Sequence, residues 1–381
     1  MSEVRHDWLS DRWVIFAPSR SERPDEFEVF ERASRLSGSE LCKSQSKISL
    51  TCPFCFGQEK ETPAPVLVLG EGATNGEGVR WRVRVVPNKF PAVIPVDHFG
   101  MELSEIEELS ETQPMCPEAP QQFESVLYHR RPLLGAHEVI IESPDHVASV
   151  TQLSVEHLES VFLAFQMRLT HWRRHPSLQY AVVFKNCGAD AGASLVHTHS
   201  QLIATSFVPP EVARLSHRME QFRQEFAKCY GCTVVAEEIA KQERIIRQTN
   251  SFVAFCPFAS SLPYSFVVAP IEHNPRFEDL DRCALNEFTG MVFELLKSLE
   301  SIFPQNAYNF VLHTSPFHDH WNRAFHWRLE VIPRLTKLAG FEWGSSCFIN
   351  PVLPETAAAQ LRQATAAHPE ACENVGRTAT C

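Results

Sequence analysis

The segment NCGADAGASLVHTHSQ, residues 186–201, carries more information about fold and chemistry than any other part of the chain. Apolar, β-prone segments precede and follow it, so we expect its last five residues to lie on or next to a strand. Alternate side chains of a strand share a face. This puts His197, His199 and Gln201 on one side and the threonine and serine between them on the other. A buried imidazole or amide without a partner costs about 1–3 kcal/mol, so these three side chains need a metal, a ligand or each other.

The composition is that of a globular protein with an acidic balance. The 381 residues are 44% hydrophobic and 21% charged, and this length suggests two domains or one duplicated unit. The formal net charge of −11 argues against nucleic acids and anionic membranes as partners, because both bind basic surfaces. The first residues lack an apolar signal core and no run is long enough to span a membrane, so we expect a cytoplasmic protein.

Two pairs stand out among the 12 cysteines. Cys52 and Cys55 are separated by two residues, and so are Cys229 and Cys232, which is the gap that lets two thiolates bind one tetrahedral metal ion. Redox sites use the same gap, so the spacing alone leaves both interpretations open. A disulfide framework is the weaker interpretation for a chain without a signal peptide.

The histidines downstream of each cysteine pair suggest an internal repeat. Each half contains a cysteine pair, an apolar strand closed by a proline with a histidine close behind, a second apolar strand beginning with tyrosine, and a last histidine. The histidines behind the prolines are His146 and His273, and the last histidines are His197 and His326. The same order in both halves predicts a duplicated chain.

The repeat supplies two sets of four ligands for zinc. A closed tetrahedral zinc site takes ionised thiols and neutral imidazoles, and it is structural because no position is left for a substrate. The alternative is a group of reduced core cysteines and hydrogen-bonded histidines. The predicted zinc ligands are Cys52, Cys55, His146 and His197 in the first half, and Cys229, Cys232, His273 and His326 in the second half.

Aligning the two halves separates the two histidines of the opening segment. His197 pairs with His326, whereas His199 pairs with Arg328. Arginine has a pKa above about 12 and cannot serve as a nucleophile or base at neutral pH. Because four ligands are already counted in the first half, His199 is free to react. We therefore expect one catalytic centre, in the first half.

His199 has the properties of a nucleophile that attacks phosphorus. An imidazole is largely neutral near pH 7, attacks without prior deprotonation and leaves readily from a phosphoramidate. Gln201 can donate to a phosphate oxygen as charge builds there. Gly188, Gly192 and Ser194 lie in the preceding loop, where small residues let backbone amides approach a phosphate. The alternative for His199 is a hydrogen-bonded core histidine.

The combined motifs resemble the galactose-1-phosphate uridylyltransferase family of the histidine-triad superfamily, which includes a branch of ADP-glucose phosphorylases. Residues 186–201, Cys52–Cys55, Pro87–Ala92 and Ser143–His146 carry the resemblance, which extends over residues 5 to about 362. It implies an α+β fold in two duplicated halves, each an antiparallel sheet flanked by helices, and a homodimer. It also implies ping-pong chemistry, in which a histidine takes the nucleotidyl group from a nucleotide sugar, sugar 1-phosphate leaves and a second phosphate acceptor collects the group.

The resemblance also assigns roles to single residues. It makes His199 the nucleophile and Gln201 its phosphate-binding partner. Arg20 and Arg23 match a basic motif that in the family reaches the substrate of the neighbouring subunit, with ordinary solvated arginines as the alternative. Glu342 resembles a residue of sugar recognition, with a surface glutamate as the alternative. The residues expected to line the nucleotide site are Asn88, Val139, Asn186, Gly192 and Ser194.

Two departures from the family pattern bear on the metal and the substrate. Iron-binding members use a glutamate and closely spaced histidines in the second half. Here Leu215 and Arg328 stand at two of these places, so we expect no iron and instead zinc in both halves. Thr198 and Ser200 replace a proline and a glycine, a pattern that leans toward the ADP-glucose phosphorylases but is shared by many bacterial uridylyltransferases. Uridylyl transfer between UDP-glucose and galactose 1-phosphate, a step of galactose metabolism, is the first expectation, and ADP-glucose phosphorolysis is the alternative.

Two further function classes stay open. A zinc-organised binding module would keep the cysteine pairs but would not need His199 and Gln201 on one face. A histidine-triad hydrolase would keep the nucleophile and pass the nucleotidyl group to water.

The chain is expected to divide into a catalytic domain, a second domain and a tail. The predicted ranges are 1–210, 211–366 and 367–381, and we expect the tail to be disordered. Residues 33–50 and about 103–126 have the composition of surface insertions.

Overall fold

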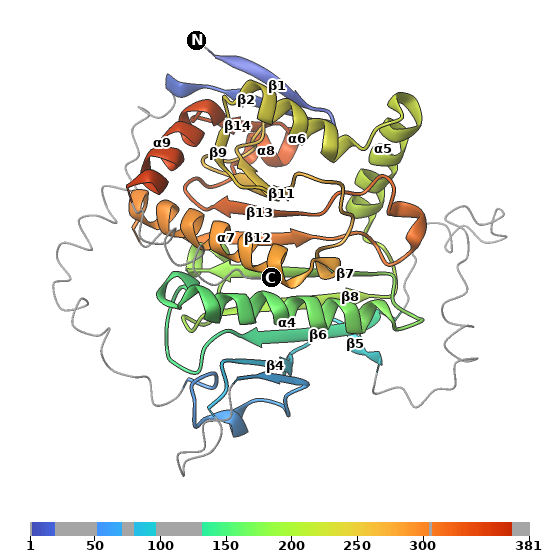
Figure 1. Cartoon of the computed structure of the whole chain (residues 1–381), viewed down its shortest axis with the longest axis vertical. Coiled ribbons are helices and arrows are strands. Elements are labelled where there is room, and N and C mark those ends of the chain that lie inside the picture. Colours follow the sequence, from blue (N-terminus) through green and yellow to red (C-terminus); the bar gives the residue numbers. More distant parts are fainter. Residues whose placement is uncertain (1, 20–51, 71–79, 97–131, 305–306, 368–381) are drawn as a thin grey trace.

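The computed structural model is an α+β protein built around one large sheet (Figure 1). The residues that it describes are 2–19, 52–70, 80–96, 132–304 and 307–367. The predicted insertions at 33–50 and 103–126 lie outside the described residues, as does the predicted tail beyond Ala367. Among the helices of the described part, none has both the length and the apolar character that a membrane span requires.

The strands and helices are as follows. The strands are β1 (Glu3–Asp7), β2 (Arg12–Phe16), β3 (Leu67–Leu69), β4 (Val83–Pro87), β5 (Ile94–Pro95), β6 (Leu134–Ile141), β7 (Tyr180–Cys187), β8 (His199–Thr205), β9 (Ile245–Gln248), β10 (Phe252–Phe255), β11 (Phe266–Pro270), β12 (Tyr308–His313), β13 (Arg328–Pro333) and β14 (Phe348–Asn350). The α-helices are α4 (Val155–Arg173), α5 (Pro210–Phe226), α6 (Tyr230–Lys241), α7 (Arg282–Ile302), α8 (Gly340–Ser345) and α9 (Pro354–Ala366).

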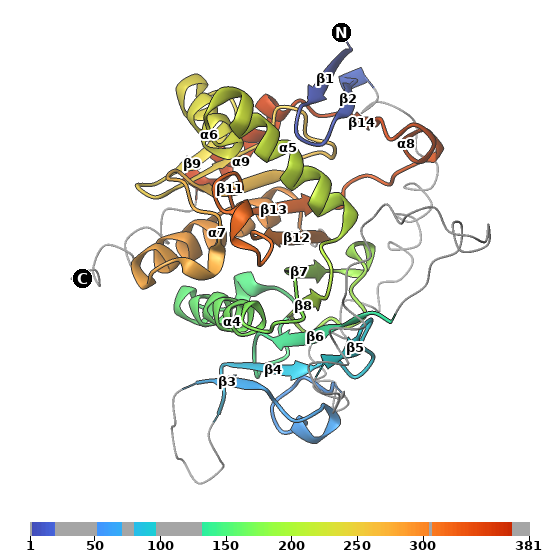
Figure 2. The ribbon, with the colours of Figure 1, turned by 90° about the vertical axis from the view of Figure 1, so that its right-hand side faces the viewer.

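The order of the strands confirms the duplicated architecture. The main path of the 11-stranded sheet runs β3-β4-β6-β8-β7-β12-β13-β11-β10-β9, and β5 pairs with β6 at the side. This order is symmetrical about the β7–β12 pair, so that β8 corresponds to β13 and β6 to β11 (Figure 2). The two half-sheets expected from the sequence are therefore joined edge to edge into one sheet. The predicted domain boundary at residue 210 stays a prediction.

The strand register repeats in the two halves. Gln201 in β8 lies opposite Val139 in β6, and Glu330 in β13 lies opposite Val267 in β11. Two positions before Gln201, β8 begins with His199, and two positions before Glu330, β13 begins with Arg328. These are the two residues that the sequence repeat aligns. The register therefore supports the pairing of residues inferred from the repeat.

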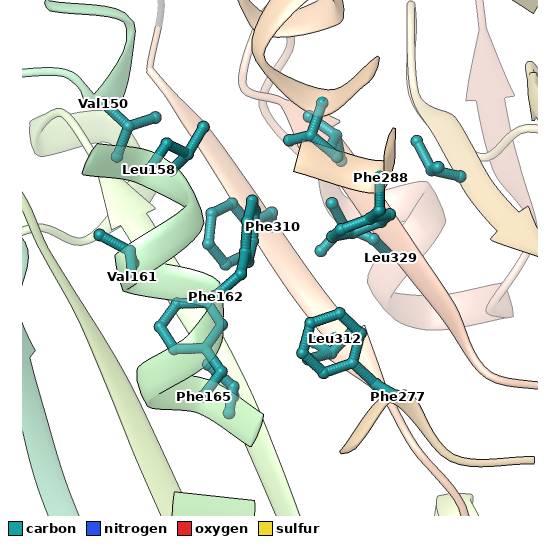
Figure 3. Packing of buried hydrophobic residues seen from close by; sticks show 14 of the residues in the cluster. Val150, Leu158, Val161, Phe162, Phe165, Phe277, Phe288, Phe310, Leu312 and Leu329 are labelled. Atoms are coloured by element: carbon teal, nitrogen blue, oxygen red, sulfur yellow. The ribbon is translucent and has the colours of Figure 1, made fainter. Parts of the chain in front are cut away.

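Helices α4 and α7 pack on one face of the sheet and enclose the main core. The rings of Phe162 in α4 and Phe288 in α7 lie 5.0 Å apart, and Phe310 of β12 belongs to the same cluster (Figure 3). Leu202 and Ala204 of β8 are also fully buried in this core. Because side chains alternate along a strand, the odd-numbered residues at the start of β8 point to the opposite face. The core thus fixes which face carries the candidate chemistry.

A buried ion pair attaches α4 to the sheet. Arg168 donates through Nε and Nη2 to the two carboxylate oxygens of Glu138 in β6, at 2.9 and 2.6 Å. Trp172 Nε1 donates to the same carboxylate at 3.0 Å. Both charges are satisfied by hydrogen bonds, which is the condition under which a buried pair is tolerated. The pair fixes β6, the neighbour of β8, relative to the helix layer.

A second, three-stranded sheet, of order β1-β2-β14, lies at the far end of the second half (Figure 1). Helices α5 and α6 lie beside it, and residues of all these elements line one cavity together with β11 and β13. The open face of the second half-sheet is therefore covered by the N-terminal strands and by two helices.

Candidate active site

His199 is the first residue of β8, and its ring is held by one hydrogen bond. Its Nδ1 lies 2.8 Å from the carbonyl oxygen of His197. A carbonyl oxygen only accepts, so Nδ1 carries the proton and donates it. In the neutral ring the lone pair is then on Nε2. The backbone thus selects the tautomer in which Nε2 is the reactive atom.

The surroundings of His199 keep its ring neutral. Burial is the largest influence and lowers the pKa of His199 below its ordinary value of 6.5, with nearby Lys185 acting in the same direction. The hydrogen bond to the His197 carbonyl and the charge of Glu142 act in the opposite direction but do not outweigh burial. A neutral imidazole with a free Nε2 is the form that attacks an electrophile.

A buried charge network lies behind the histidines, and the sequence analysis missed it. Lys185 of β7 donates through Nζ to Glu142 Oε2 at 2.5 Å, to Thr198 Oγ1 at 2.8 Å and to the His199 carbonyl oxygen at 3.0 Å. The hydroxyl groups of Thr198 and Ser200 donate to the two oxygens of Glu142, each at 2.5 Å. Thr198 and Ser200 therefore point away from the candidate site, as the alternation of a strand predicts.

The network holds the start of β8 rigidly. Glu142 is fully buried, and although burial opposes its charge, Lys185 and the two hydroxyl groups keep its pKa below the ordinary value. The sequence did contain a signal for these two charges. Lys185 interrupts the largely apolar strand β7, and Glu142 directly follows the end of β6. Only the pairing of β6, β7 and β8 shows that the two charges meet.

Gln201 is oriented by His137 of β6, another residue that the sequence analysis missed. The backbone N–H of Ala92 donates to His137 Nδ1 at 3.1 Å, so a neutral His137 carries its proton on Nε2. Burial lowers the pKa of His137, which favours this neutral form. His137 Nε2 then donates to Gln201 Oε1 at 2.9 Å. The amide NH₂ of Gln201 is left to act as a donor toward a ligand.

Asn88 lies beside the same imidazole. Its Nδ2 is 3.1 Å from His137 Nε2, and its Oδ1 accepts from the backbone N–H of Phe90 at 2.8 Å. The amide NH₂ of Asn88 therefore lies on the side of Gln201. Val139 is buried directly opposite Gln201 in the β6–β8 pair. The structure thus brings Asn88 and Val139, both predicted to line the nucleotide site, close to Gln201, the predicted phosphate-binding partner of His199.

Asn186 and the glycine loop are held by a residue of the second half. Asn309 of β12 donates through Nδ2 to Asn186 Oδ1 at 2.8 Å and to the Ala191 carbonyl oxygen at 2.9 Å. Because its oxygen is occupied, Asn186 can offer its NH₂ to a ligand. Gly188 and Gly192 have φ values of +84° and +85°, a region that side chains other than glycine adopt at a cost. Ser194, also in the loop, is exposed.

The first predicted zinc set is assembled in the structure. The Nδ1 atom of His197 lies 3.6 Å from both Cys52 Sγ and Cys55 Sγ, and His146 Nδ1 lies 3.4 Å from Cys55 Sγ. Tetrahedral zinc with ordinary bond lengths separates a thiolate sulfur from an imidazole nitrogen by about 3.6 Å. All four ligand atoms lie within 4.8 Å of one another. These residues fit a zinc ion.

The second predicted set has the same arrangement. The Nδ1 atom of His326 lies 3.9 Å from Cys229 Sγ and 3.4 Å from Cys232 Sγ, and His273 Nδ1 lies 3.6 Å from Cys232 Sγ. Its four ligand atoms are likewise within 4.8 Å of one another. Both halves therefore contain a group that could hold a metal ion.

Backbone carbonyl groups orient two of the histidines predicted to bind zinc. Nε2 of His197 donates to the Ser143 carbonyl oxygen at 2.8 Å, and Nε2 of His326 donates to the Pro270 carbonyl oxygen at 2.9 Å. Each contact puts the ring proton on Nε2 and leaves the Nδ1 lone pair directed at the cysteines. Burial also lowers the pKa of His197 to about 4, so this ring stays neutral, as a metal ligand must.

Three other predicted residues are not placed beside His199. Arg20 and Arg23 lie outside the described residues. Glu342 lies in α8, which packs on β14 of the three-stranded sheet, and its carboxylate accepts from the backbone N–H of Ala339 at 3.0 Å. Among the described residues, no hydrogen bond of Glu342 reaches the region of His199.

Comparisons with known proteins show which proteins the chain is similar to. A family described as galactose-1-phosphate uridyl transferase, N-terminal domain, matches residues 104–209. An ADP-glucose phosphorylase of Arabidopsis thaliana is 30% identical over 95% of this chain and 92% of its own length. A galactose-1-phosphate uridylyltransferase of Thermotoga maritima is 28% identical, over 95% of this chain and 98% of its own length.

A solved structure extends the similarity to the fold. The crystal structure of an ADP-glucose phosphorylase from Arabidopsis thaliana with bound ADP-glucose has a TM-score of 0.74 and 28% identity, covering 95% of this chain and 98% of that one. The sequence match extends over nearly the whole of both proteins. The chain therefore belongs to the galactose-1-phosphate uridylyltransferase family of the histidine-triad superfamily and is an enzyme that transfers nucleotidyl groups.

Proposed function

We propose that this enzyme moves a nucleotidyl group from a nucleotide sugar to a phosphate-bearing acceptor by way of His199. One observation carries the proposal. The ring of His199 donates Nδ1–H to the His197 carbonyl oxygen and so presents an unprotonated Nε2 on the face shared with Gln201. A zinc-binding module without catalysis would not need this arrangement.

The two half-reactions follow from this geometry. His199 Nε2 attacks the α-phosphorus of the donor, a nitrogen–phosphorus bond forms, and the bond to the bridging oxygen breaks. Sugar 1-phosphate leaves with the electron pair of the broken bond. The hydrogen bond from Nδ1 to the His197 carbonyl oxygen stabilises the positive charge that develops on the ring. A phosphate oxygen of the acceptor then attacks the same phosphorus, the nitrogen–phosphorus bond breaks, and its electron pair returns to Nε2, which restores the neutral imidazole.

The amide groups around His199 would hold the phosphate as charge develops. Gln201, Asn88 and Asn186 have their amide oxygens engaged by His137, Phe90 and Asn309, which leaves three NH₂ groups as donors. Donors fixed in advance stabilise the charge of a transition state without having to reorganise. Ser194 would add its backbone amide from the loop, whereas the backbone N–H of Gly192 already donates to the Ala189 carbonyl oxygen at 2.9 Å.

Two donor–acceptor pairs are candidates. Uridylyl transfer between UDP-glucose and galactose 1-phosphate is the first, because several relatives, including those of Thermotoga maritima and Haemophilus influenzae, are galactose-1-phosphate uridylyltransferases. ADP-glucose phosphorolysis, in which inorganic phosphate is the acceptor, is the second. A specific observation favours it, because the Arabidopsis thaliana ADP-glucose phosphorylase matches nearly the full chain at 30% identity.

The test uses donors labelled in the α-phosphate. The protein is mixed with labelled UDP-glucose or ADP-glucose, and the label retained on the protein is measured before and after an acceptor is added. We expect label from one donor, which identifies the base, and release only by phosphate or galactose 1-phosphate, which identifies the acceptor. Absence of label from both donors would contradict the proposal. Rapid release by water alone would indicate a hydrolase.

The first half-reaction should stay fast in mildly acidic solution. Neutral His199 is the reactive form, and its pKa lies below the ordinary 6.5, so its rate should fall only as the pH drops through that lower value. We expect the acid limb of the rate of protein labelling to have its midpoint below pH 6.5. A midpoint at or above pH 6.5 in single-turnover measurements would mean that burial does not lower the pKa of His199.

We further propose that each half holds a structural zinc ion. Both sets consist of two thiols and two imidazoles at zinc-like separations, and such an ion would join the strands that carry its ligands. The four cysteines of these sets are free, and thiolate ligands persist in a reducing compartment such as the cytoplasm, where we place the enzyme.

Matched cysteine variants test the two zinc sites. The wild-type protein should contain two zinc ions per chain, and Cys52→Ser and Cys229→Ser should each contain one. Cys52→Ser should also lower nucleotidyl transfer by at least about tenfold, because His197 both ligates this metal and positions His199. Cys229→Ser should affect activity less. Full zinc content in either variant, measured by elemental analysis, would contradict the assignment of its site.

We propose a homodimer as the working form. Glu342 lies in α8, which packs against β14 of the three-stranded sheet, whereas His199 lies in β8 of the large sheet. A role for Glu342 in sugar recognition therefore needs a second copy of the chain to bring α8 to the site. Arg20 and Arg23 are proposed to contribute in the same way.

A further inference from the structure

The second half contains a partly open cavity of about 420 Å³ on the open face of its half-sheet. Its floor is formed by β11, β12 and β13, and its walls by α5, α6 and the N-terminal strands. The volume is in the range of small-molecule binding sites, which is about 300–1,000 Å³. Nothing in the proposed mechanism uses this cavity.

The cavity is the counterpart of the candidate nucleotide site. The pair Val139 and Gln201 in the first half corresponds by strand register to the pair Val267 and Glu330 in the second. Val267 and Glu330 both line the cavity. The duplication has therefore kept a hollow at the position where the first half would hold a nucleotide.

The polar residues of the site have counterparts here as well. Phe184 lies opposite Gln201 in β7–β8, and Val311 lies opposite Glu330 in β12–β13. Two residues further along each strand stand Asn186 in the first half and His313 in the second, and His313 lies opposite Arg328. The three polar residues of the first half thus correspond to three different residues in the second: Asn186 to His313, His199 to Arg328, and Gln201 to Glu330.

These replacements leave a cation available for a ligand. Arg328 lines the cavity, and its positive charge helps to lower the pKa of Glu330. Among the described residues, no hydrogen bond or close ion pair engages its guanidinium. The carboxylate of Glu330 accepts from His313 Nε2 at 3.1 Å through one oxygen only, which leaves Oε1 able to accept from another group. Arg12, a second cation, also lines the cavity, and it pairs with Glu211 at 3.2 Å.

We propose that this cavity is a second, non-catalytic binding site for a nucleoside monophosphate. Arg328 binds the phosphate through its two-pronged guanidinium, and Glu330 accepts a hydrogen bond from a ribose hydroxyl. The base packs against the apolar side chains of Val234, Phe255 and Val267, which also line the cavity. Because arginine stands where His199 stands in the first half, the bound nucleotide is held and not transferred. The proposal does not depend on which base His199 transfers.

The test counts nucleotides bound to each chain. Equilibrium dialysis with radiolabelled AMP, and separately with UMP, is performed on the wild-type protein and on Arg328→Met, which keeps the apolar stem and removes the charge. For one of the two nucleotides, the wild type should bind two per chain and Arg328→Met one. Arg334→Met, which removes an exposed arginine just after the same strand, should behave as the wild type.

Further variants separate the possible outcomes. Arg328→Lys keeps the positive charge but loses the two parallel N–H donors of the guanidinium. This variant should bind the second nucleotide about tenfold more weakly than the wild type. Unchanged zinc content verifies that each variant is folded, and Arg328→Lys is used alone if Arg328→Met loses zinc. A wild type that binds one nucleotide and an Arg328→Met that binds none would support this site while counting against nucleotide binding beside His199. Equal binding by the wild type and the Arg328 variants would overturn the proposal, as would displacement of AMP or UMP by an equal concentration of inorganic phosphate.

Discussion

His199→Ala is expected to lower nucleotidyl transfer by at least about 10⁴-fold, the scale on which enzymes lose activity when a nucleophile is removed. The reason is chemical, because the neighbouring His197 has its Nε2 engaged by the Ser143 carbonyl oxygen and its Nδ1 directed at two cysteines. The other imidazole beside Gln201, that of His137, has its Nε2 engaged by Gln201 Oε1 at 2.9 Å. The measurement is the steady-state rate with the donor and acceptor identified by the labelling experiment.

A matched control separates chemistry from stability. His171 is an exposed histidine of α4, the helix on the other face of the sheet, and His171→Ala should keep the wild-type rate. Both variants should keep two zinc ions per chain and the same unfolding midpoint to within a few degrees. A His199→Ala protein that is folded, loaded with zinc and still within about tenfold of the wild-type rate would remove His199 from the role of nucleophile.

Lys185→Met is expected to destabilise the protein by about 3–5 kcal/mol, the cost of leaving one member of a buried ion pair without its partner. Lys185 is the only cation hydrogen-bonded to Glu142 in the described part of the chain, and both side chains are buried. Methionine fills most of the volume of lysine but leaves the carboxylate with only the hydroxyl groups of Thr198 and Ser200. The measurement is the free energy of unfolding from denaturant titration, read from the transition that includes the first half.

A double-mutant cycle tests whether this loss comes from the unpaired charge. Glu142→Gln removes the charge and keeps the shape, so Lys185→Met combined with Glu142→Gln should recover part of the stability lost in Lys185→Met. The same double variant should lose activity, because Lys185 also donates to the His199 carbonyl oxygen and fixes the start of β8. Strictly additive losses in the cycle would mean that the two charges do not interact in the folded protein.

Features that depend on local periodicity and on spacing were predictable from the sequence. The alternation of β8 puts His197 and His199 against the same ring, Phe54, at centroid distances of 5.9 and 5.3 Å. The cysteine spacing and the repeated order of histidines predicted two metal groups, and both are assembled. A side-chain period of two and a gap of two residues are properties of short segments, so they need no knowledge of the tertiary fold.

Features that depend on strand pairing were not predictable in the same way. Glu142 and Lys185 are 43 positions apart, and they meet only because β6 and β7 flank β8. The amide orientation of Gln201 depends on His137, and this contact exists only in one register of β6 against β8. The sequence also did not predict that β7 pairs with β12 and so joins the two half-sheets, because a repeat does not reveal which edges of its two copies pair.

The central claim is that a nucleotidyl group is held on Nε2 of His199 between the two half-reactions. Intact-mass spectrometry of the protein incubated with the donor and no acceptor, followed by peptide mapping, tests this directly. We expect a mass increase of one nucleotidyl group per chain, located on His199, lost when acceptor is added and absent from His199→Ala. Turnover without any covalent adduct, or an adduct on a residue other than His199, would contradict it.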